Sequence, residues 1–294
     1  MNEENKYLIE MLADELSQES QCDVMLITGD MFHDMQDLVI REIYEREYKE
    51  DALLFILATP GGLIDCAYRI ARAIQRNYDK AYALIPGWCK SAGTLCVIGA
   101  NEIIMCDNAE LGPLDVQIAR RDELGVRDSG LILNEALLNL EIHAFSLFEH
   151  FLMQIKEKSG GVITFKTATE VSAILVNGLL APIYSQIDPQ RMGESARLLN
   201  VAMAYGQRLN YSTRNLNRKS LQSLTTGYPS HGFVIDRDEA SLLFRRVREP
   251  STKEAELIRA LGSQASELSP VPVVKYLNSR KNTHEQNGTE TGDQ

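Results

Sequence analysis

The feature of this sequence that most constrains its fold is a pattern that occurs twice in the first hundred residues. A short apolar run leads into a turn, and the turn leads into apolar residues at helical spacing. The first copy has the run Leu53–Leu57 and the turn Ala58-Thr-Pro-Gly-Gly62; the second has the run Ala81–Ile85 and the turn Lys90-Ser-Ala-Gly-Thr94. Strand, turn and helix in this repeated order predict a parallel β-sheet with crossover helices, which is an α/β fold.

The two turns carry groups that could act together in acyl transfer. Neighbouring parallel strands release their turns side by side at the carboxyl end of the sheet, where open α/β folds place their sites. There the backbone N–H groups of Gly61 or Gly62, and of Ala92 at the positive end of a helix, could hold a developing oxyanion. Ser91 would supply a hydroxyl at the start of that helix. A serine in this place is most often only a helix cap, but its pairing with the glycine turn predicts a nucleophile.

The composition limits the partners that we expect. The 41 acidic residues outnumber the 30 basic ones, and the formal charge of -11 argues against binding to nucleic acid or to an anionic membrane. We expect no membrane span, because no apolar run approaches the ~20 residues that one needs. The acidic start of the chain does not resemble a signal peptide. The 5 cysteines show no Cys-x-x-Cys spacing, which predicts reduced thiols in a cytoplasmic protein, with no metal and no other cofactor.

Changes in pattern along the chain predict three parts. A helix at 1–20 precedes an α/β domain at 21–269, and a largely helical insertion interrupts that domain at about 130–225. Residues 270–294 lose all periodicity and are rich in polar residues, so we expect a disordered tail. Within the insertion, 131–157 is amphipathic and longer than a crossover helix needs. An apolar face of that length predicts a homo-oligomer.

Five short motifs together resemble a known superfamily. In their order they are similar to the Clp-type serine peptidases, and the closest similarity within that superfamily is to the serine dehydrogenase proteinase family, whose members carry a Gly-Pro-x-Asp segment and a later Ser-His-Gly-Phe. The resemblance covers about residues 20–245. It implies a Clp/crotonase-like fold of stacked β–β–α units, oligomers, and a peptide or protein substrate. The motifs are Thr28-Gly29, Thr59-Pro-Gly-Gly62, Lys90-Ser-Ala-Gly-Thr94, Glu102-Ile-Ile-Met-Cys-Asp-Asn108 and Leu111-Gly-Pro-Leu-Asp115.

One departure from the Clp pattern leaves the general base open. Clp peptidases place the catalytic histidine in the segment that here reads Glu110–Val116, and this chain has no histidine there. We favour His231, because its segment resembles the place where Clp peptidases carry the triad aspartate. Asp115 could orient a base or hold a loop.

Two other kinds of base compete with His231. Signal-peptide peptidases of this fold use a Ser-Lys dyad, and the lysines to consider are Lys90, Lys156, Lys158 and Lys166. His143 and His150 are seven residues apart and share one face of the long helix, a face that is more typical of a core or an interface.

The sequence therefore predicts a cytoplasmic serine peptidase. In this hypothesis Ser91 attacks a peptide carbonyl, His231 accepts the hydroxyl proton, and Gly61, Gly62 and Ala92 hold the oxyanion. Two alternatives remain. One is an inactive Clp-fold scaffold whose helical insertion mediates assembly. The other is a crotonase-type acyl-CoA enzyme, which shares the fold and the oxyanion hole but has no need of a serine at the helix start.

Overall fold

The chain forms two compact units. The computed structural model describes residues 3–114, 117–119, 127–266 and 271–279. The first unit comprises residues 1–114 and 201–294, and the second comprises residues 115–200. The helical unit thus ends earlier than the expected boundary near residue 225. The reason is that α7 (Pro189–Thr213) enters the α/β core, where Ala202 and Leu209 are fully buried.

The first unit is built on a six-stranded sheet with the order β10-β1-β2-β3-β5-β9. All neighbouring pairs are parallel except β10 and β1, which are antiparallel. Every residue of β1 and β2 is buried, as expected for parallel strands that have helices on both faces. This confirms the predicted α/β class. The strands are β1 (Cys22–Thr28), β2 (Ala52–Ala58), β3 (Lys80–Ile85), β5 (Glu102–Met105), β9 (Val247–Arg248) and β10 (Val273–Tyr276).

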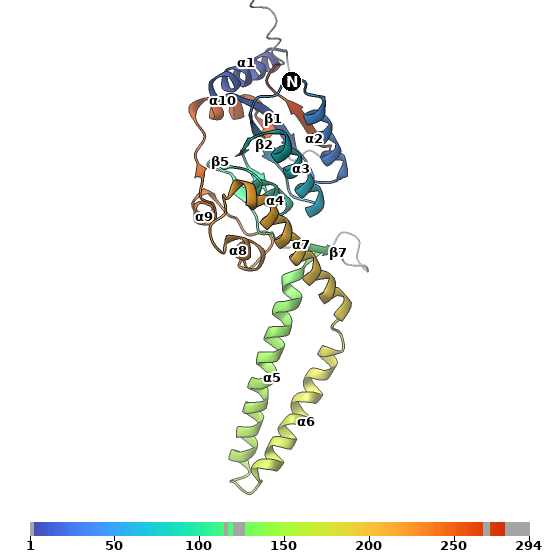
Figure 1. Cartoon of the computed structure of the whole chain (residues 1–294). Helices are drawn as coiled ribbons and strands as arrows, with labels where there is room; N and C mark the ends of the chain where they lie inside the picture. The colour runs from blue at the N-terminus through green and yellow to red at the C-terminus, as the bar shows by residue number, and fades with distance from the viewer. Residues whose placement is uncertain (1–2, 115–116, 120–126, 267–270, 280–294) are drawn as a thin grey trace, which may run out of the picture. The chain divides into compact units, whose positions relative to one another are not determined.

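Alternate residues of the strands pack into two separate apolar layers, one on each face of the sheet. Ile27 and Phe55 point to the layer that contains α2, α3 and α4, whereas Leu26 and Ile56 point to the layer that contains α1, α10 and α11. Figure 1 shows these two sets of helices on either side of the sheet. The period of two along a strand produces this division. The helices are α1 (Glu3–Ser20), α2 (His33–Glu45), α3 (Ile64–Asn77), α4 (Ala92–Ile98), α10 (Thr252–Leu261) and α11 (Ser263–Ser266).

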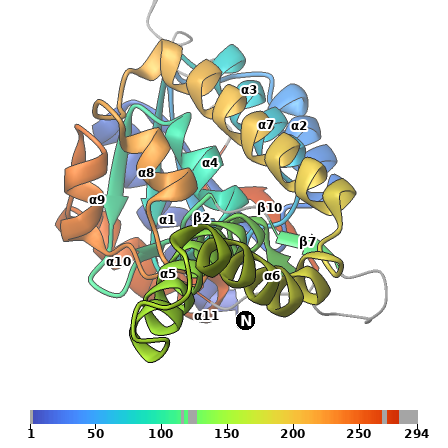
Figure 2. The same ribbon diagram turned by 90° about the horizontal axis from the view of Figure 1, so that it is seen from below.

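The sheet continues past the carboxyl ends of its central strands in short bridges. Thr59, which follows β2, pairs with Cys89 of β4 (Trp88–Cys89), and β4 pairs in turn with β6 (Glu110–Leu111). Leu111 bridges to Ile235. The helices near these bridges are α8 (Ser220–Thr226) and α9 (Arg237–Leu243). The part of α7 that belongs to this unit runs beside α3, where the rings of Tyr68 and Tyr205 stack with centroids 4.1 Å apart (Figure 2).

The C-terminal segment differs from the expected disordered tail. Val273–Tyr276 forms β10 at the edge of the sheet, and Asn278 anchors the chain just after it. The amide of Asn278 accepts a hydrogen bond from the Val24 N–H at 3.0 Å and donates one to Asp23 at 3.2 Å. Four residues give too short a pattern to predict a strand whose partner lies some 250 residues earlier. Residues 280–294 lie outside the described part of the chain.

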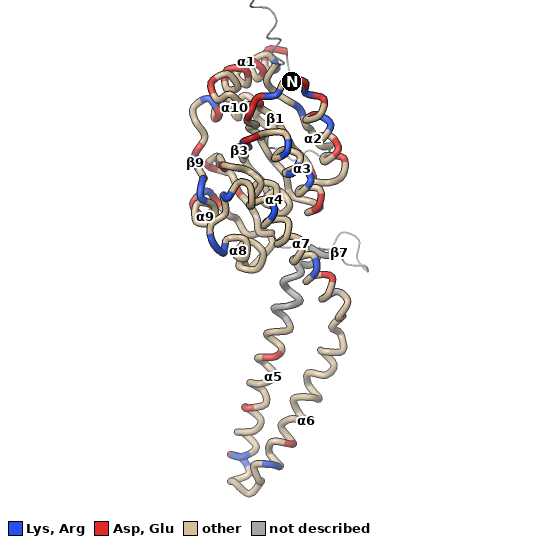
Figure 3. The backbone as a smooth tube through the Cα atoms, in the orientation of Figure 1, with Lys and Arg blue, Asp and Glu red and all other residues tan. Residues whose placement is uncertain are grey.

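The second unit consists mainly of the helical hairpin α5 (Gly130–Lys158) and α6 (Phe165–Tyr184), with the short pair β7 (Gln117–Ala119) and β8 (Arg127–Ser129). Figure 3 shows that charged residues are sparse along both helices and gather at the turn between them. Many large apolar side chains of the hairpin are exposed, among them Leu138, Ile142, Phe145, Ile174 and Leu179.

The helix α6 bears on the expected absence of a membrane span. Among the described helices it is long and apolar enough to cross a bilayer, and 17% of its apolar stretch is buried. From the sequence we expected no apolar segment of this length. Core helices of soluble proteins meet the same criterion, so the absence of a span stays a prediction.

Candidate active site

Ser91 has a backbone conformation that serine adopts rarely. Its φ is 49° and its ψ is -111°, directly before the first residue of α4. Side chains with a Cβ are strained in this region, and such strain gathers at functional sites. The Ser91 side chain makes no capping hydrogen bond to the helix. The usual structural role of a serine at a helix start is therefore not the role of Ser91.

The glycine turn lies directly against Ser91. A Cβ on Gly61 would be 3.0 Å from both the Lys90 carbonyl oxygen and the Ser91 Cβ, and 3.5 Å from the Ala92 nitrogen. Only a glycine allows this approach, and the φ of Gly61 is also positive at 109°. The structure thus brings together the two turns that the sequence analysis paired.

The N–H groups of Gly61 and Gly62 differ in their hydrogen bonding. The Gly61 N–H donates to the Thr59 hydroxyl at 3.1 Å. Gly62 forms a parallel bridge with Met31. The hydrogen bonds of this bridge are made by the two neighbours of Gly62: the Met31 N–H donates to the Gly61 carbonyl at 2.8 Å, and the Leu63 N–H donates to the Met31 carbonyl at 2.9 Å. In a parallel bridge of this kind the N–H of Gly62 itself points to the opposite side of its strand. That side is the one on which Thr59 pairs with β4, just before Ser91.

Ala92 begins α4, so its N–H belongs to the first turn, whose N–H groups have no acceptor within the helix. The close packing of α4 against Thr59 and Cys89 depends on Gly93. A Cβ there would be 2.5 Å from the Thr59 methyl group and 2.9 Å from the Cys89 sulfur. The packing of this turn therefore fixes the direction of the Ala92 N–H relative to the glycine turn.

Lys90 has a positioning role that the sequence analysis missed. Its ammonium group pairs with Glu110 at 2.9 Å and donates to the carbonyls of Leu111 and Phe233 at 3.3 Å each. All three acceptors lie in β6 or near residue 233. Lys90 directly precedes Ser91, so these contacts tie both segments to the turn that carries Ser91.

The loop after β6 is held to the first turn of α4. The fully buried Thr94 hydroxyl lies 2.7 Å from the Gly112 carbonyl oxygen, and it accepts from the Gly112 N–H at 3.1 Å. Asp115 follows three residues later but lies outside the described residues, so its predicted supporting role stays a prediction.

His231 lies in a segment that the structure brings to the Lys90 side of the site. Two residues beyond it, the Phe233 carbonyl accepts from Lys90, and Ile235 exchanges backbone hydrogen bonds with Leu111 at 2.8 and 3.1 Å. The imidazole is half-buried. The competing candidates His143 and His150 are exposed on α5 in the other unit, where the Lys156 ammonium donates to the Ile163 carbonyl at 2.9 Å.

A family model matches the segment that carries this arrangement. Residues 18–126 match the family described as the ClpP-like SDH-type serine proteinase, which places this segment in the Clp-type serine peptidase superfamily. The match contains the glycine turn, Ser91 and the loop after β6. It confirms the predicted resemblance to Clp-type peptidases of the serine dehydrogenase proteinase kind.

Two uncharacterised proteins from Methanocaldococcus jannaschii are similar to parts of this chain. The protein MJ0137 is 38% identical over 72 residues, which is 24% of this chain and 25% of that protein. The protein MJ1495 is 31% identical over 131 residues, which is 42% of this chain and 44% of that protein. The matched segments therefore span less than half the length of either relative.

Solved structures of the 1510-N membrane-bound stomatin-specific protease are also similar. A serine-to-alanine mutant is 21% identical with a TM-score of 0.33, over 50% of this chain and 67% of that chain. A lysine-to-alanine mutant in complex with a substrate peptide is 16% identical with a TM-score of 0.47, over 87% of this chain and 86% of that chain.

Proposed function

We propose that this protein is a serine peptidase in which Ser91 is the nucleophile. The observation that carries the proposal is that Ser91 sits in a strained conformation, without a capping bond, against a glycine turn. A sharp turn that presents a serine at a helix start is also how other hydrolases expose their nucleophile. The match of residues 18–126 to a serine proteinase family supports the same reaction.

The proposed reaction follows from this arrangement. The Ser91 Oγ attacks the carbonyl carbon of a peptide bond while its proton passes to a base. The carbonyl oxygen becomes an oxyanion, which accepts hydrogen bonds from the N–H groups of Gly62 and Ala92. The intermediate collapses when the protonated base gives its proton to the leaving amine. Water then hydrolyses the acyl-serine through the same base and restores the hydroxyl.

His231 is the base that we propose, because its segment is fastened to Lys90, the neighbour of Ser91. Lys90 is a less suitable base, because its ammonium group is held in an ion pair with Glu110. We also propose a cytoplasmic location, which is supported by the five cysteines, all of them free thiols.

The hairpin supports a homo-oligomer in which two copies of this chain pair their α5–α6 units. An apolar groove of about 530 Å³ lies between the helices, lined in part by Phe148, Val176 and Leu180. The exposed carboxylates of Glu141 and Glu149 lie along α5. Carboxylates are costly at the centre of a bilayer, whereas a protein interface can leave them at its rim, so a second copy suits this surface better than lipid.

Hydrolysis of a fluorogenic peptide library tests the proposed activity. We expect wild-type protein to cleave part of the library and Ser91→Ala to lose that activity by several orders of magnitude. Ser241→Ala, which removes an exposed hydroxyl from α9, is the matched control and should retain it. Full activity in Ser91→Ala would exclude Ser91 as the nucleophile.

A further inference from the structure

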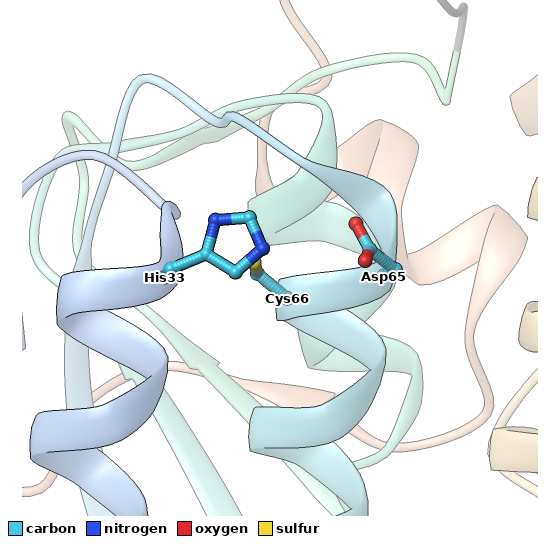
Figure 4. Close-up of side chains that lie close together, drawn as sticks. All are labelled: His33, Asp65 and Cys66. Atoms are coloured by element: carbon cyan, nitrogen blue, oxygen red, sulfur yellow. The ribbon is translucent and has the colours of Figure 1, made fainter.

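Three side chains with metal-ligand chemistry converge between the first turns of α2 and α3. They are His33, the first residue of α2, and Asp65 and Cys66 in the first turn of α3. One nitrogen, one carboxylate oxygen and one sulfur all lie within 4.8 Å of one another. Figure 4 shows the imidazole of His33 extending from α2 toward α3, where it overlaps the Cys66 side chain in this view and the Asp65 carboxylate lies beyond it.

We propose that His33, Asp65 and Cys66 bind one zinc-type transition-metal ion, an activity separate from the peptidase reaction. Imidazole, thiolate and carboxylate are the donors that Zn²⁺ takes from proteins, and hard ions such as Mg²⁺ and Ca²⁺ avoid thiolate. Three protein ligands leave the fourth tetrahedral position for water.

The separation of the donors suits a small ion. Tetrahedral bonds of about 2.0–2.3 Å place ligand atoms roughly 3.2–3.8 Å apart, so the donors must move together by about an ångström. The buried Cys66 is fixed, whereas His33 is exposed and can rotate about its side-chain bonds. The exposed imidazole also leaves an entry path from solvent.

The backbone holds the two ligand-bearing turns in place. Met31, two residues before His33, pairs with Gly62, three residues before Asp65. Both helices then pack in the same apolar layer, through Met35 of α2 and Ala67 of α3. The ion would therefore bridge two elements that are already fixed to each other, which lowers the entropy cost of forming the site.

The charges around the thiol are mixed. Burial is the main cause that raises the pKa of Cys66, followed by the negative charge of Asp65, while Arg69 acts in the opposite direction and Asp37 adds to the increase.

Sequence spacing could not reveal this site. His33 lies 32 positions before Asp65 in the chain, and the sequence analysis expected no metal because no local cluster has metal spacing. The parallel pairing of β1 and β2 is what aligns the helices that follow them.

Cobalt titration of the full chain tests the inference, because Co²⁺ takes tetrahedral zinc sites and reports thiolate ligation by a charge-transfer band. After chelator treatment, we expect that band to saturate at one Co²⁺ per chain and to vanish when Zn²⁺ is added. Cys66→Ser should abolish the band. His33→Ala, at an exposed position where folding is not at risk, should weaken binding by at least ~100-fold, since even outer-shell changes cost 10–100-fold.

Two control variants make the test specific. Cys106→Ser removes another thiol, and Asp34→Asn removes an exposed carboxylate beside His33; both should keep the band and the affinity. Absence of the band in wild-type protein, its persistence in Cys66→Ser, or an unchanged affinity in His33→Ala would overturn the proposal.

Discussion

At the scale of single residues, Ser91 has a strained backbone and a side chain that makes no capping hydrogen bond. Its φ of 49° suits glycine, and its hydroxyl does not cap the helix that follows. A residue kept for stability alone would have neither property. The same turn is fixed from three directions, by Gly61, by the Lys90–Glu110 pair and by Thr94. These contacts fix the backbone on either side of Ser91, which is the preorganisation that the proposed nucleophile needs.

The strain at Ser91 predicts that a glycine there stabilises the protein. Ser91→Gly should raise the free energy of unfolding by roughly 1 kcal/mol, because glycine adopts a positive φ without the cost of a Cβ. Ser91→Ala keeps the Cβ and loses no capping bond, so it should change the stability by less than about 0.5 kcal/mol. Urea unfolding followed by circular dichroism measures both. A loss of 1 kcal/mol or more in Ser91→Ala would show that its hydroxyl is structural.

The proposed base predicts the effect of one substitution. If His231 accepts the Ser91 proton, its removal should slow peptide hydrolysis, because the hydroxyl then lacks its base. His231→Ala should then lower kcat by ~10²–10⁴-fold with little change in KM. His150→Ala, at an exposed histidine of the other unit, is the control. Activity near the wild-type level in His231→Ala would remove it from the mechanism.

The residues show how far sequence reasoning reaches. The sequence was enough to select four site residues, because the turns that follow neighbouring parallel strands lie side by side at the carboxyl edge of the sheet. These residues are Gly61, Gly62, Ser91 and Ala92. The structure adds that the Gly61 N–H donates to Thr59 within its own turn, whereas Gly62 pairs with Met31 through the hydrogen bonds of its neighbours. The positioning role of Lys90 depends on contacts with Glu110 and Phe233. These partners lie 20 and 143 residues away, so no local sequence pattern predicts them.

At the scale of elements, strands with long buried runs were the easiest to predict. The expected run Leu53–Leu57 became β2 with one more residue at each end, because a short continuous apolar run that ends at a Pro-Gly-Gly turn is typical of a parallel strand buried on both faces. In contrast, β9 and β10 were missed. They have two and four residues, and half-buried edge strands carry a weak pattern.

The hairpin predicts self-association. The 33.0 kDa chain should sediment as a dimer or larger at micromolar concentration. Ile142→Glu combined with Ile174→Glu should weaken association by at least ~10-fold, since both side chains are more than 60% exposed and apolar. Val162→Glu, at an 87% exposed position in the turn of the hairpin, is the control. A wild-type monomer, or flotation with lipid vesicles without self-association, would contradict this interface.

At the scale of the whole molecule, a buried polar cluster closes the end of the sheet opposite to Ser91. Asp23, at the start of β1, pairs with Arg46 and accepts from the Tyr78 hydroxyl at 3.0 Å. The Tyr78 and Tyr276 oxygens are 2.6 Å apart, and the Arg46 guanidinium lies over the Tyr276 ring. This cluster joins β1, α2, α3 and β10, so one end of the sheet is fixed by polar contacts while the other carries the site.

The tyrosines of this cluster predict a loss of stability at high pH. Burial raises the pKa of Tyr276 to about 12 and is also the main cause that raises the pKa of Tyr78. A tyrosine in the unfolded chain titrates near ~10. Because the folded state holds these protons more tightly, their contribution to stability is complete below about pH 10 and is lost as the pH rises through 12.

Urea unfolding between pH 8 and pH 11 checks this expectation. The free energy of unfolding should fall above about pH 10, and the fall should be smaller in Tyr276→Phe. Tyr211→Phe, at an 82% exposed position, should follow the wild type. An equal alkaline loss in wild type and Tyr276→Phe would show that Tyr276 does not contribute to it.

The central claim, that Ser91 is an activated nucleophile, is tested most directly by labelling the full chain with a fluorophosphonate probe and mapping the modified residue by mass spectrometry. Such probes react with activated serines and spare ordinary ones. The account predicts one label, on the peptide that contains Ser91. The label should be absent in Ser91→Ala and unchanged in Ser241→Ala. A wild-type protein that takes no label, or takes it elsewhere, would contradict the account and favour a scaffold or a crotonase-type enzyme.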